Sequence, residues 1–473
     1  KFLRRSKDRK VFVVGLDCGD PVLVFDQWRD ELPNFRQLMD VGAYGPLDSC
    51  VPCITVPAWS SMTSGKDPGV LGFYGFRNRA DYSYENMTIA TGAAVHEPRV
   101  WEMLGKTGQE VVVVGVPQTY PVKPVNGQMI SSFLTPSVKS QYTFPNEFRY
   151  EIDQLLDGRT YDVDVHQVRT EDKDFLLRQI YEMTEKRFTV LKHMLKGKPW
   201  DFFMFVEMGV DRIQHGLWQY MDSSHLKYRP DNPYQEAIKE YYKYIDRELG
   251  EMLSALDDDT VVMVVSDHGA KRMDGGICIN EWLRREGYLV LKDDPMREGY
   301  RPIPFEKVEV DWEKTTAWGA GGYYARIFLN VRGRESHGLI PQASYEKVRD
   351  QIAAEIEAIP DHQGNPINTT CFKPQAIYQQ VRNIPPDLII YLGNLHWRSV
   401  GSFGFDSIYT FENDTGPDDA NHAQEGMIIY YDPTRNLSGQ RLNGLQLMDF
   451  APTVLHLMGQ PIPEDMQGKV IEL

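Results

Sequence analysis

Six side chains of metal-binding types lie beside short apolar runs of the sequence. Asp211 and His215 are four residues apart in GVDRIQHG, so a helix would place both on one face. Asp267 and His268 are adjacent at the end of another apolar run. Open α/β sheets bind ligands at the carboxyl ends of their strands. We therefore expect one cavity to be lined by Asp17, Asp211, His215, Asp267, His268 and His422.

This set of three carboxylates and three imidazoles favours a borderline metal ion. Without a thiolate, such ligands suit Zn²⁺ or Mn²⁺, and we predict Zn²⁺ in preference to Mn²⁺. Six ligands exceed the need of one tetrahedral ion but fit two ions, which lie about 3.5–4 Å apart in two-metal enzymes. Each motif alone has another explanation, because a strand-end aspartate often caps a helix and a lone DxxxH arises by chance. Their joint occurrence favours a two-metal centre.

Thr55 is the candidate nucleophile in the stretch CITVPAWSSMTSG, residues 53–65. The proline at position 57 and the hydroxyl-rich residues after it predict a helix that begins near Thr55. Metal coordination activates a threonine hydroxyl, and the backbone N–H groups of a helix start favour a phosphate oxygen. The alternative is that Thr55 only caps this helix.

Short β-branched runs alternate with helical patterns along the chain. The runs predict buried parallel strands at 11–17, 111–116, 202–208, 261–267, 387–392 and 426–431. The clearest helical patterns lie at 34–41, 175–195 and 234–256. This alternation predicts an α/β fold with a doubly wound, mainly parallel sheet flanked by helices.

Residues 269–386 break this rhythm with the Gly-rich turn GAGGYY, a strand-like ARIFLNV and one helix near 344–358. We expect a catalytic core formed by residues 1–274 and 386–473, with an inserted cap subdomain at 275–385. Within the cap, Trp318, Tyr323 and Tyr324 are candidates to stack on a base or sugar ring, or simply to pack.

Composition limits the classes of partner. Lys plus Arg is 51 and Asp plus Glu is 67, so the formal net charge of −16 argues against a nucleic acid polymer. The sequence contains no run of 18 apolar residues, so we predict no membrane span. Five cysteines in a chain of 473 residues do not form a disulfide framework, which favours a cytoplasmic location. The basic start KFLRRSKDRK has no apolar leader, and a trimmed leader stays open as an alternative.

An ordered set of motifs resembles the alkaline phosphatase superfamily. The motifs are GLD (15–17), TVPAWSSMTSGKDPGVLG (55–72), DRIQH (211–215), SDHG (266–269) and NHAQEG (421–426). The tail at 449–471 is also similar to the usual end of such proteins. The chain looks most like the type I phosphodiesterase/nucleotide pyrophosphatase branch and its predicted phosphohydrolase and phosphomutase relatives. The resemblance implies an alkaline phosphatase-like core.

The resemblance also implies roles for the candidate residues. Asp17, Asp267, His268 and the Thr55 oxygen would hold one metal ion. Asp211, His215 and His422 would hold the other. Thr55 would attack phosphorus and form a phosphothreonine intermediate, which water would hydrolyse. Thr55-Val56-Pro57-Ala58-Trp59 lacks the nucleophile and the arginine of the sulfatase branch, so sulfatase activity is not expected.

The predicted substrate contacts are less defined. The branch resembled usually has an asparagine about twenty residues after the nucleophile, where this chain has Phe76, Arg77 and Asn78. Arg77 would favour a dianionic monoester and Asn78 a diester. His396 is a further candidate substrate contact.

We therefore predict a two-metal phosphohydrolase that cleaves a phosphodiester or pyrophosphate bond in a small nucleotide or nucleotide-sugar type substrate. A phosphomutase or phosphomonoesterase with the same site is the alternative, with the cap excluding water in the mutase case. A non-catalytic, metal-dependent binding protein for phosphate esters is the third hypothesis. The sequence makes no prediction about the oligomeric state.

Overall fold

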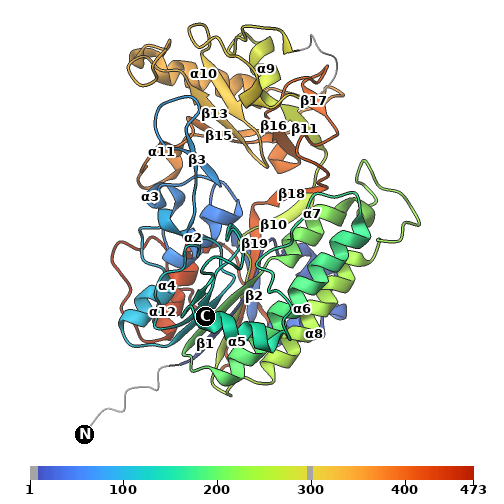
Figure 1. Cartoon of the computed structure of the whole chain (residues 1–473), viewed down its shortest axis with the longest axis vertical. Helices are drawn as coiled ribbons and strands as arrows, with labels where there is room; N and C mark the ends of the chain where they lie inside the picture. Colours follow the sequence, from blue (N-terminus) through green and yellow to red (C-terminus); the bar gives the residue numbers. More distant parts are fainter. Residues whose placement is uncertain (1–8, 296–301) are drawn as a thin grey trace.

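The computed structural model describes residues 9–295 and 302–473 (Figure 1). Its central sheet has ten strands in the order β20-β2-β19-β9-β1-β8-β5-β6-β7, with β21 also paired to β2. The strands are β1 Val11–Leu16, β2 Ala43–Asp48, β5 Val111–Val114, β6 Gly127–Ile130, β7 Thr143–Phe144, β8 Phe202–Glu207, β9 Val261–Val265, β19 Glu425–Tyr431, β20 Gln440–Arg441 and β21 Leu445–Gln446. The middle of the sheet, from β9 through β1, β8 and β5 to β6, is parallel.

Helices cover both faces of this sheet, which confirms the predicted fold class. Figure 1 shows α2, α4 and α12 on one side of the central strands and α6, α7 and α8 on the other. Strands β1, β5, β8 and β9 are buried along their whole length, as expected for parallel strands between two helical layers. The helices around the sheet are α1 Pro33–Val41, α2 Thr55–Ser64, α3 Pro68–Leu71, α4 Val100–Lys106, α5 Phe148–Leu155, α6 Lys173–Gly197, α7 Gly209–Met221, α8 Ala237–Leu253 and α12 Phe450–Leu457.

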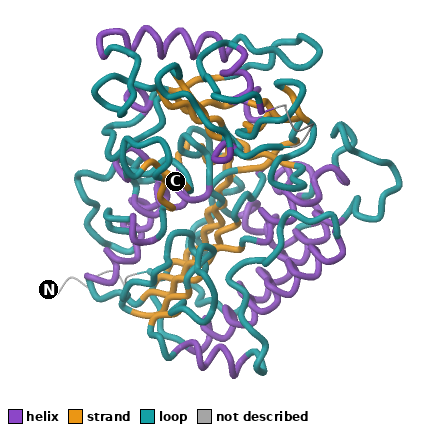
Figure 2. Tube along the Cα trace, turned by 45° about the horizontal axis from the view of Figure 1, so that its top comes forward, coloured by secondary structure: helices purple, strands orange, loops and turns teal. Residues whose placement is uncertain are grey.

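A second group of strands forms what we call the upper lobe (Figure 2). One of its sheets has the order β12-β13-β15-β14 and is antiparallel throughout. Another has the order β16-β11-β17. Its elements are β11 Gly275–Cys278, α9 Ile279–Arg285, β12 Ala317–Ala320, β13 Ala325–Leu329, α10 Tyr345–Glu357, β14 Thr370–Phe372, α11 Pro374–Ile377, β15 Leu388–Tyr391, β16 Trp397–Val400 and β17 Tyr409–Thr410. The lobe has its own buried apolar cluster, separate from that of the central sheet.

Two short ribbons complete the fold. The strands β10 Gly269–Arg272 and β18 Ala420–Ala423 pair antiparallel where the chain passes between the central sheet and the upper lobe. The strands β3 Arg77–Arg79 and β4 Met87–Ile89 form a hairpin. In residues 9–295 and 302–473, no helix combines the length and the apolar character that a membrane crossing requires.

Two strand predictions were wrong about pairing. The run at 387–392 contains β15, which lies in the upper lobe and pairs antiparallel with β13 and β14 rather than joining the central sheet. The run at 426–431 does join the central sheet, but as β19 it is antiparallel to both β2 and β9. Both strands are buried, so their apolar runs look like those of parallel strands.

These pairings bear on the extent of the insertion. A cap that ends at residue 385 would separate β15 from its partners β13 and β14. It would also separate β16 and β17 from β11. We therefore propose that the inserted subdomain runs from β11 to β17.

Candidate metal centre

The ends of two neighbouring strands hold the first half of the centre. Asp17 follows β1, Asp267 and His268 follow β9, and these strands are adjacent and parallel. His268 Nε2 lies 3.2 Å from Asp267 Oδ2 and 3.7 Å from Asp17 Oδ1. Trp59 Nε1–H donates to Asp17 Oδ2 at 2.7 Å, which holds this carboxylate in place. The parallel pairing therefore brings together residues that are about 250 positions apart in sequence.

Helix α7 and strand β18 supply the second half. Asp211 and His215 share one face of α7, with His215 Nε2 3.2 Å from Asp211 Oδ1. His422 on β18 places its Nε2 3.2 Å from His215 Nε2 and 4.0 Å from Asp211 Oδ1. The rings of His268 and His422 stack with centroids 3.7 Å apart, which joins the two halves. All six predicted ligands are buried and converge on one place.

Each of the three imidazoles presents Nε2 to the centre because Nδ1 has a partner elsewhere. The carbonyl oxygen of Gly269 accepts from His268 Nδ1–H at 3.0 Å, and that of Cys53 accepts from His422 Nδ1–H at 2.8 Å. His215 Nδ1–H donates to Asp418 Oδ1 at 2.8 Å. Such partners fix the tautomer and orient a histidine that binds a metal through its other nitrogen.

The buried carboxylates fit a cation at this place. Burial, and next the charge of Asp211, raise the pKa of Asp17 to about 8. Burial and the charge of Asp17 likewise raise the pKa of Asp267. Asp267 Oδ2 is buried and has no hydrogen-bond partner among the described residues. Divalent ions would neutralise these charges and give this oxygen a partner, so the residues present fit the predicted metals.

A cysteine also lies beside the centre. Cys18 Sγ is within 4.8 Å of ligand atoms of Asp211 and His215. Its thiol donates to the carbonyl oxygen of Gly269 at 3.4 Å, and burial, with the charge of Asp211, raises its pKa well above the usual value. Asp211 and His215 also have His422 beside them, so the centre does not need Cys18 as a ligand.

Thr55 is the first residue of α2 and faces the centre. Ile54 is the N-cap residue, and no side chain caps the helix, so Thr55 does not serve as its cap. Thr55 Oγ1–H donates to Asp17 Oδ1 at 3.4 Å, and Oγ1 lies 3.5 Å from His268 Nε2. The hydroxyl therefore lies on the same side of the centre as Asp17 and His268.

Of the three predicted substrate contacts, Asn78 and His396 make hydrogen bonds to backbone groups and Arg77 is exposed. The Asn78 amide is occupied by the backbone of its own loop, accepting from Tyr74 N at 2.7 Å and donating to Gly75 O at 2.9 Å. The Arg77 side chain is exposed on β3. His396 Nδ1–H donates to the carbonyl oxygen of Arg272 at 2.9 Å. Substrate contacts at these positions stay predictions.

Two residues beside the ligands were not assigned to the centre from the sequence. Asp418 accepts from His215 and, at 2.7 Å, from the hydroxyl of Tyr323. Burial alone would raise the pKa of Asp418, but His215 and Arg169 outweigh burial and lower it to about 2. The ring of Tyr323 stacks on His215 and His422 with centroids 4.8 and 4.5 Å apart. Asp418 stands four positions before His422 in DDANHAQEG, but nothing in this local sequence indicates that it contacts His215.

Comparison with known proteins decides the family. The model of the type I phosphodiesterase/nucleotide pyrophosphatase family matches residues 11–418. The chain belongs to this family. The protein is therefore an enzyme of the metal-dependent phosphoryl hydrolase class, as the motif resemblance implies. Comparison with curated proteins gives no match.

Solved structures of this superfamily share the fold at low sequence identity. Human ectonucleotide pyrophosphatase/phosphodiesterase 5 is 13% identical with a TM-score of 0.56, and 97% of each chain is covered. An inactive threonine-to-alanine variant of the murine protein, in complex with AMP, is 12% identical with a TM-score of 0.55 and the same coverage. Phosphonoacetate hydrolase from Sinorhizobium meliloti 1021, in complex with phosphonoacetate, is 16% identical with a TM-score of 0.60, covering 96% of this chain and 97% of that one.

Proposed function

We propose that this family member hydrolyses a phosphodiester or pyrophosphate bond in a small nucleotide or nucleotide-sugar type substrate, with Thr55 as the nucleophile. The observation that carries the proposal is the position of Thr55 Oγ1, 3.4 Å from Asp17 and 3.5 Å from His268 at the start of α2. The inactive threonine-to-alanine variant of the murine relative supports a threonine nucleophile.

We assign the ligand atoms to the two sets that the motif resemblance implies, with His268, which also groups with Asp211 and His422, between them. Asp17, Asp267 and His268 form one group within 4.8 Å, and Thr55 Oγ1 lies beside it. Asp211, His215 and His422 form the other, with their ligand atoms 3.2–4.0 Å apart. We propose that each set holds one divalent ion, with Zn²⁺ favoured over Mn²⁺ because three imidazoles take part. When bound, these ions supply the positive charge that stabilises the phosphoryl oxygens.

The proposed reaction is a double displacement, in which Thr55 is the nucleophile and Asp17 accepts its proton. Thr55 Oγ1 forms a bond to phosphorus while the bond from phosphorus to the leaving oxygen breaks, and the leaving group takes the electron pair. Asp17 Oδ1 is the acceptor within reach of the hydroxyl proton. Water next attacks the phosphothreonine, releases a phosphate monoester and returns the proton to Thr55. Backbone N–H groups at the start of α2 are placed to bind a phosphoryl oxygen through both steps.

The test compares two nucleophile variants on two model substrates. Protein loaded with Zn²⁺ or Mn²⁺ is assayed with bis-(p-nitrophenyl) phosphate and with p-nitrophenyl phosphate. We expect the diester to turn over faster, Thr55→Ala to lose about 10³-fold or more of kcat, and Thr55→Ser, which keeps a hydroxyl, to retain much more.

Other outcomes favour the other hypotheses. Faster monoester turnover favours a phosphomonoesterase, and transfer of labelled phosphate within one substrate without free phosphate favours a phosphomutase. Tight binding of phosphate esters without product in any metal indicates a binding protein. Full turnover by metal-loaded Thr55→Ala refutes the role of Thr55.

A further inference from the structure

Arg398 on β16 is a buried cation whose hydrogen bonds are unfilled. The residue is 4% exposed, and its Nε and Nη1 atoms have no hydrogen-bond partner among the described residues. The carboxylate oxygen paired with it, Asp418 Oδ2, lies 3.9 Å from Nη1, which is too far for a hydrogen bond. Burying a charged donor without a partner costs free energy, so a guanidinium in this state indicates a missing acceptor.

The carboxylates around Arg398 already have other partners, and one of them, Asp414, accepts from the Ser402 hydroxyl at 2.8 Å. Asp418 is paired with Arg169 at 3.4 Å as well as with His215. Asp274 is paired with Arg272 at 2.5 Å. Glu412 is paired with Lys227 at 3.0 Å. The missing acceptor for Arg398 is therefore not supplied by its acidic neighbours.

A small hollow beside Arg398 has room for such an acceptor. Arg398, Asn413, Asp418 and Lys227 are among its lining residues, and its volume is about 30 Å³. Asn413 Nδ2 is a second buried donor without a hydrogen-bond partner among the described residues. The volume corresponds to roughly two water-sized groups, the scale of the oxygens of one oxyanion head. Two unfilled donors at one hollow favour an anion there.

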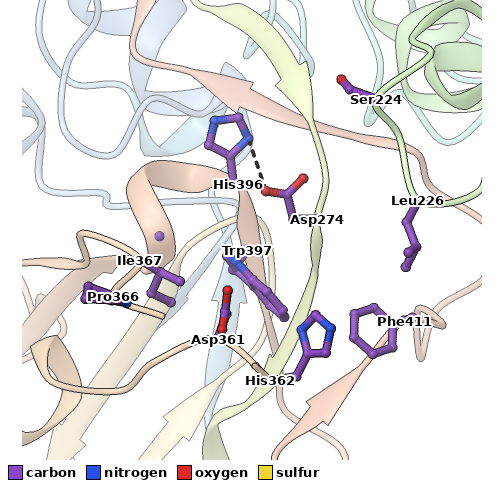
Figure 3. Close-up of a pocket in the computed structure, with 11 residues that line it drawn as sticks. Ser224, Leu226, Asp274, Asp361, His362, Pro366, Ile367, His396, Trp397 and Phe411 are labelled. Carbon is purple, nitrogen blue, oxygen red and sulfur yellow. Dashed lines mark ion pairs between the residues drawn. The ribbon is translucent and has the colours of Figure 1, made fainter. Parts of the chain in front are cut away.

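A larger cavity of about 380 Å³ adjoins this hollow and shares Leu226, Asp274 and Phe411 with it. Figure 3 shows Trp397, His362 and Phe411 grouped in this cavity, with Leu226 on the loop after α7. The His362 and Phe411 rings lie edge to face, with centroids 4.9 Å apart. A mainly apolar cavity of this size is typical of a small-molecule site, and aromatic side chains favour a planar ring.

We propose that the hollow and the cavity form one binding site for an aromatic ligand that carries an oxyanion, such as a nucleoside monophosphate. Arg398 and Asn413 hold the oxyanion, and Trp397, His362 and Phe411 contact the ring. None of the metal-ligand residues, nor Thr55, lines either space, so this site is separate from the metal centre. Asp418 is the shared neighbour, because it lines the hollow and also orients His215.

The test measures binding without turnover. The full chain is stripped of metal with a chelator and titrated calorimetrically with AMP, adenosine and inorganic phosphate. We expect AMP to bind this metal-free protein more tightly than adenosine or phosphate does. Because no reaction is monitored, failure of the proposed hydrolase function does not affect the result.

Substitutions test separately which residues hold the oxyanion and which contact the ring. Arg398→Met keeps the apolar stem and should weaken AMP about 10–100-fold while leaving adenosine unchanged, since a hydrogen bond to a charged group is lost. Arg398→Lys should recover part of this affinity. Phe411→Ala removes a side chain that is 37% exposed, so the fold tolerates it, and should weaken both AMP and adenosine. Arg326→Met, an arginine of β13 outside both spaces, is the matched control.

Three results would overturn the proposal. One is that AMP binds only when metal is present, which assigns it to the metal centre. Another is that Arg398→Met binds AMP as tightly as the control does. The third is that phosphate binds as tightly as AMP and Phe411→Ala has no effect, which leaves an adventitious ion only.

Discussion

Replacing Asp418 with asparagine tests whether this carboxylate orients His215, a proposed metal ligand. The carboxylate accepts from His215 Nδ1–H at 2.8 Å and from the Tyr323 hydroxyl at 2.7 Å. An asparagine carries no charge, so His215 Nδ1–H either loses its charged acceptor or, if the NH₂ group faces it, loses the hydrogen bond altogether. We expect the variant to fold, because the side-chain volume hardly changes, but to bind metal more weakly.

The size of the loss follows from the hydrogen bonds at stake. A hydrogen bond to a charged group contributes about 1.5–3 kcal/mol. Since a tenfold change in affinity corresponds to about 1.4 kcal/mol, the variant should bind Zn²⁺ roughly 10–100-fold more weakly. This matches the usual cost of removing the carboxylate partner of a metal-binding histidine.

The assay is a competitive titration of Zn²⁺ against a chromophoric chelator, with thermal melting to verify folding. Asp419→Asn is the matched control, because this neighbouring carboxylate contacts the backbone N–H of Gln219 at 3.4 Å and no metal-ligand side chain. A folded Asp418→Asn protein with the Zn²⁺ affinity of the control would refute the reasoning. His215 would then not be a ligand, or would not need Asp418 to orient it.

Two further predictions concern stability. A Cβ added at Gly15 would lie 2.9 Å from the Trp59 ring, so Gly15→Ala should lower the free energy of unfolding by about 1–3 kcal/mol, measured by denaturant titration. Gly197→Ala, with nothing within 4 Å of the added Cβ, is the control, and equal stability of the two variants would contradict this packing. Burial alone would raise the pKa of Asp432, but the hydrogen bonds from Arg9, 2.6 Å away, outweigh it and lower the pKa to about 2. Because an unfolded aspartate titrates near pH 3.9, the pair stabilises the fold above about pH 4 and loses its contribution as the pH falls toward 2. Asp432→Asn should therefore lower Tm at pH 7 by an amount that shrinks toward pH 3, and a constant difference over this range would contradict the prediction.

The local sequence pattern was sufficient to predict the fold class and most of the helices and strands around the site. The buried apolar runs marked β1, β5, β8 and β9, and the period of α7 placed Asp211 and His215 on one face. It was not sufficient for β15 and β19, because a strand buried on both faces has the same apolar run whichever way its neighbours point. Pairing direction depends on contacts between distant segments, which a local pattern does not contain.

The sequence by itself determined the candidate chemistry of the centre: Asp17, Asp267 and His268 follow strands at the edge of the sheet, Thr55 begins α2, and helical spacing pairs Asp211 with His215. Only the tertiary structure decided how the centre is held. Asp418 reaches His215 across about 200 positions of sequence, and the carbonyl of Cys53 reaches His422 across 369. The tertiary structure also placed Arg398, an ordinary arginine in a strand sequence, where burial leaves its donors without acceptors. A hydrogen-bond partner and a degree of burial are properties of packing between distant segments, so neither can be inferred from local sequence.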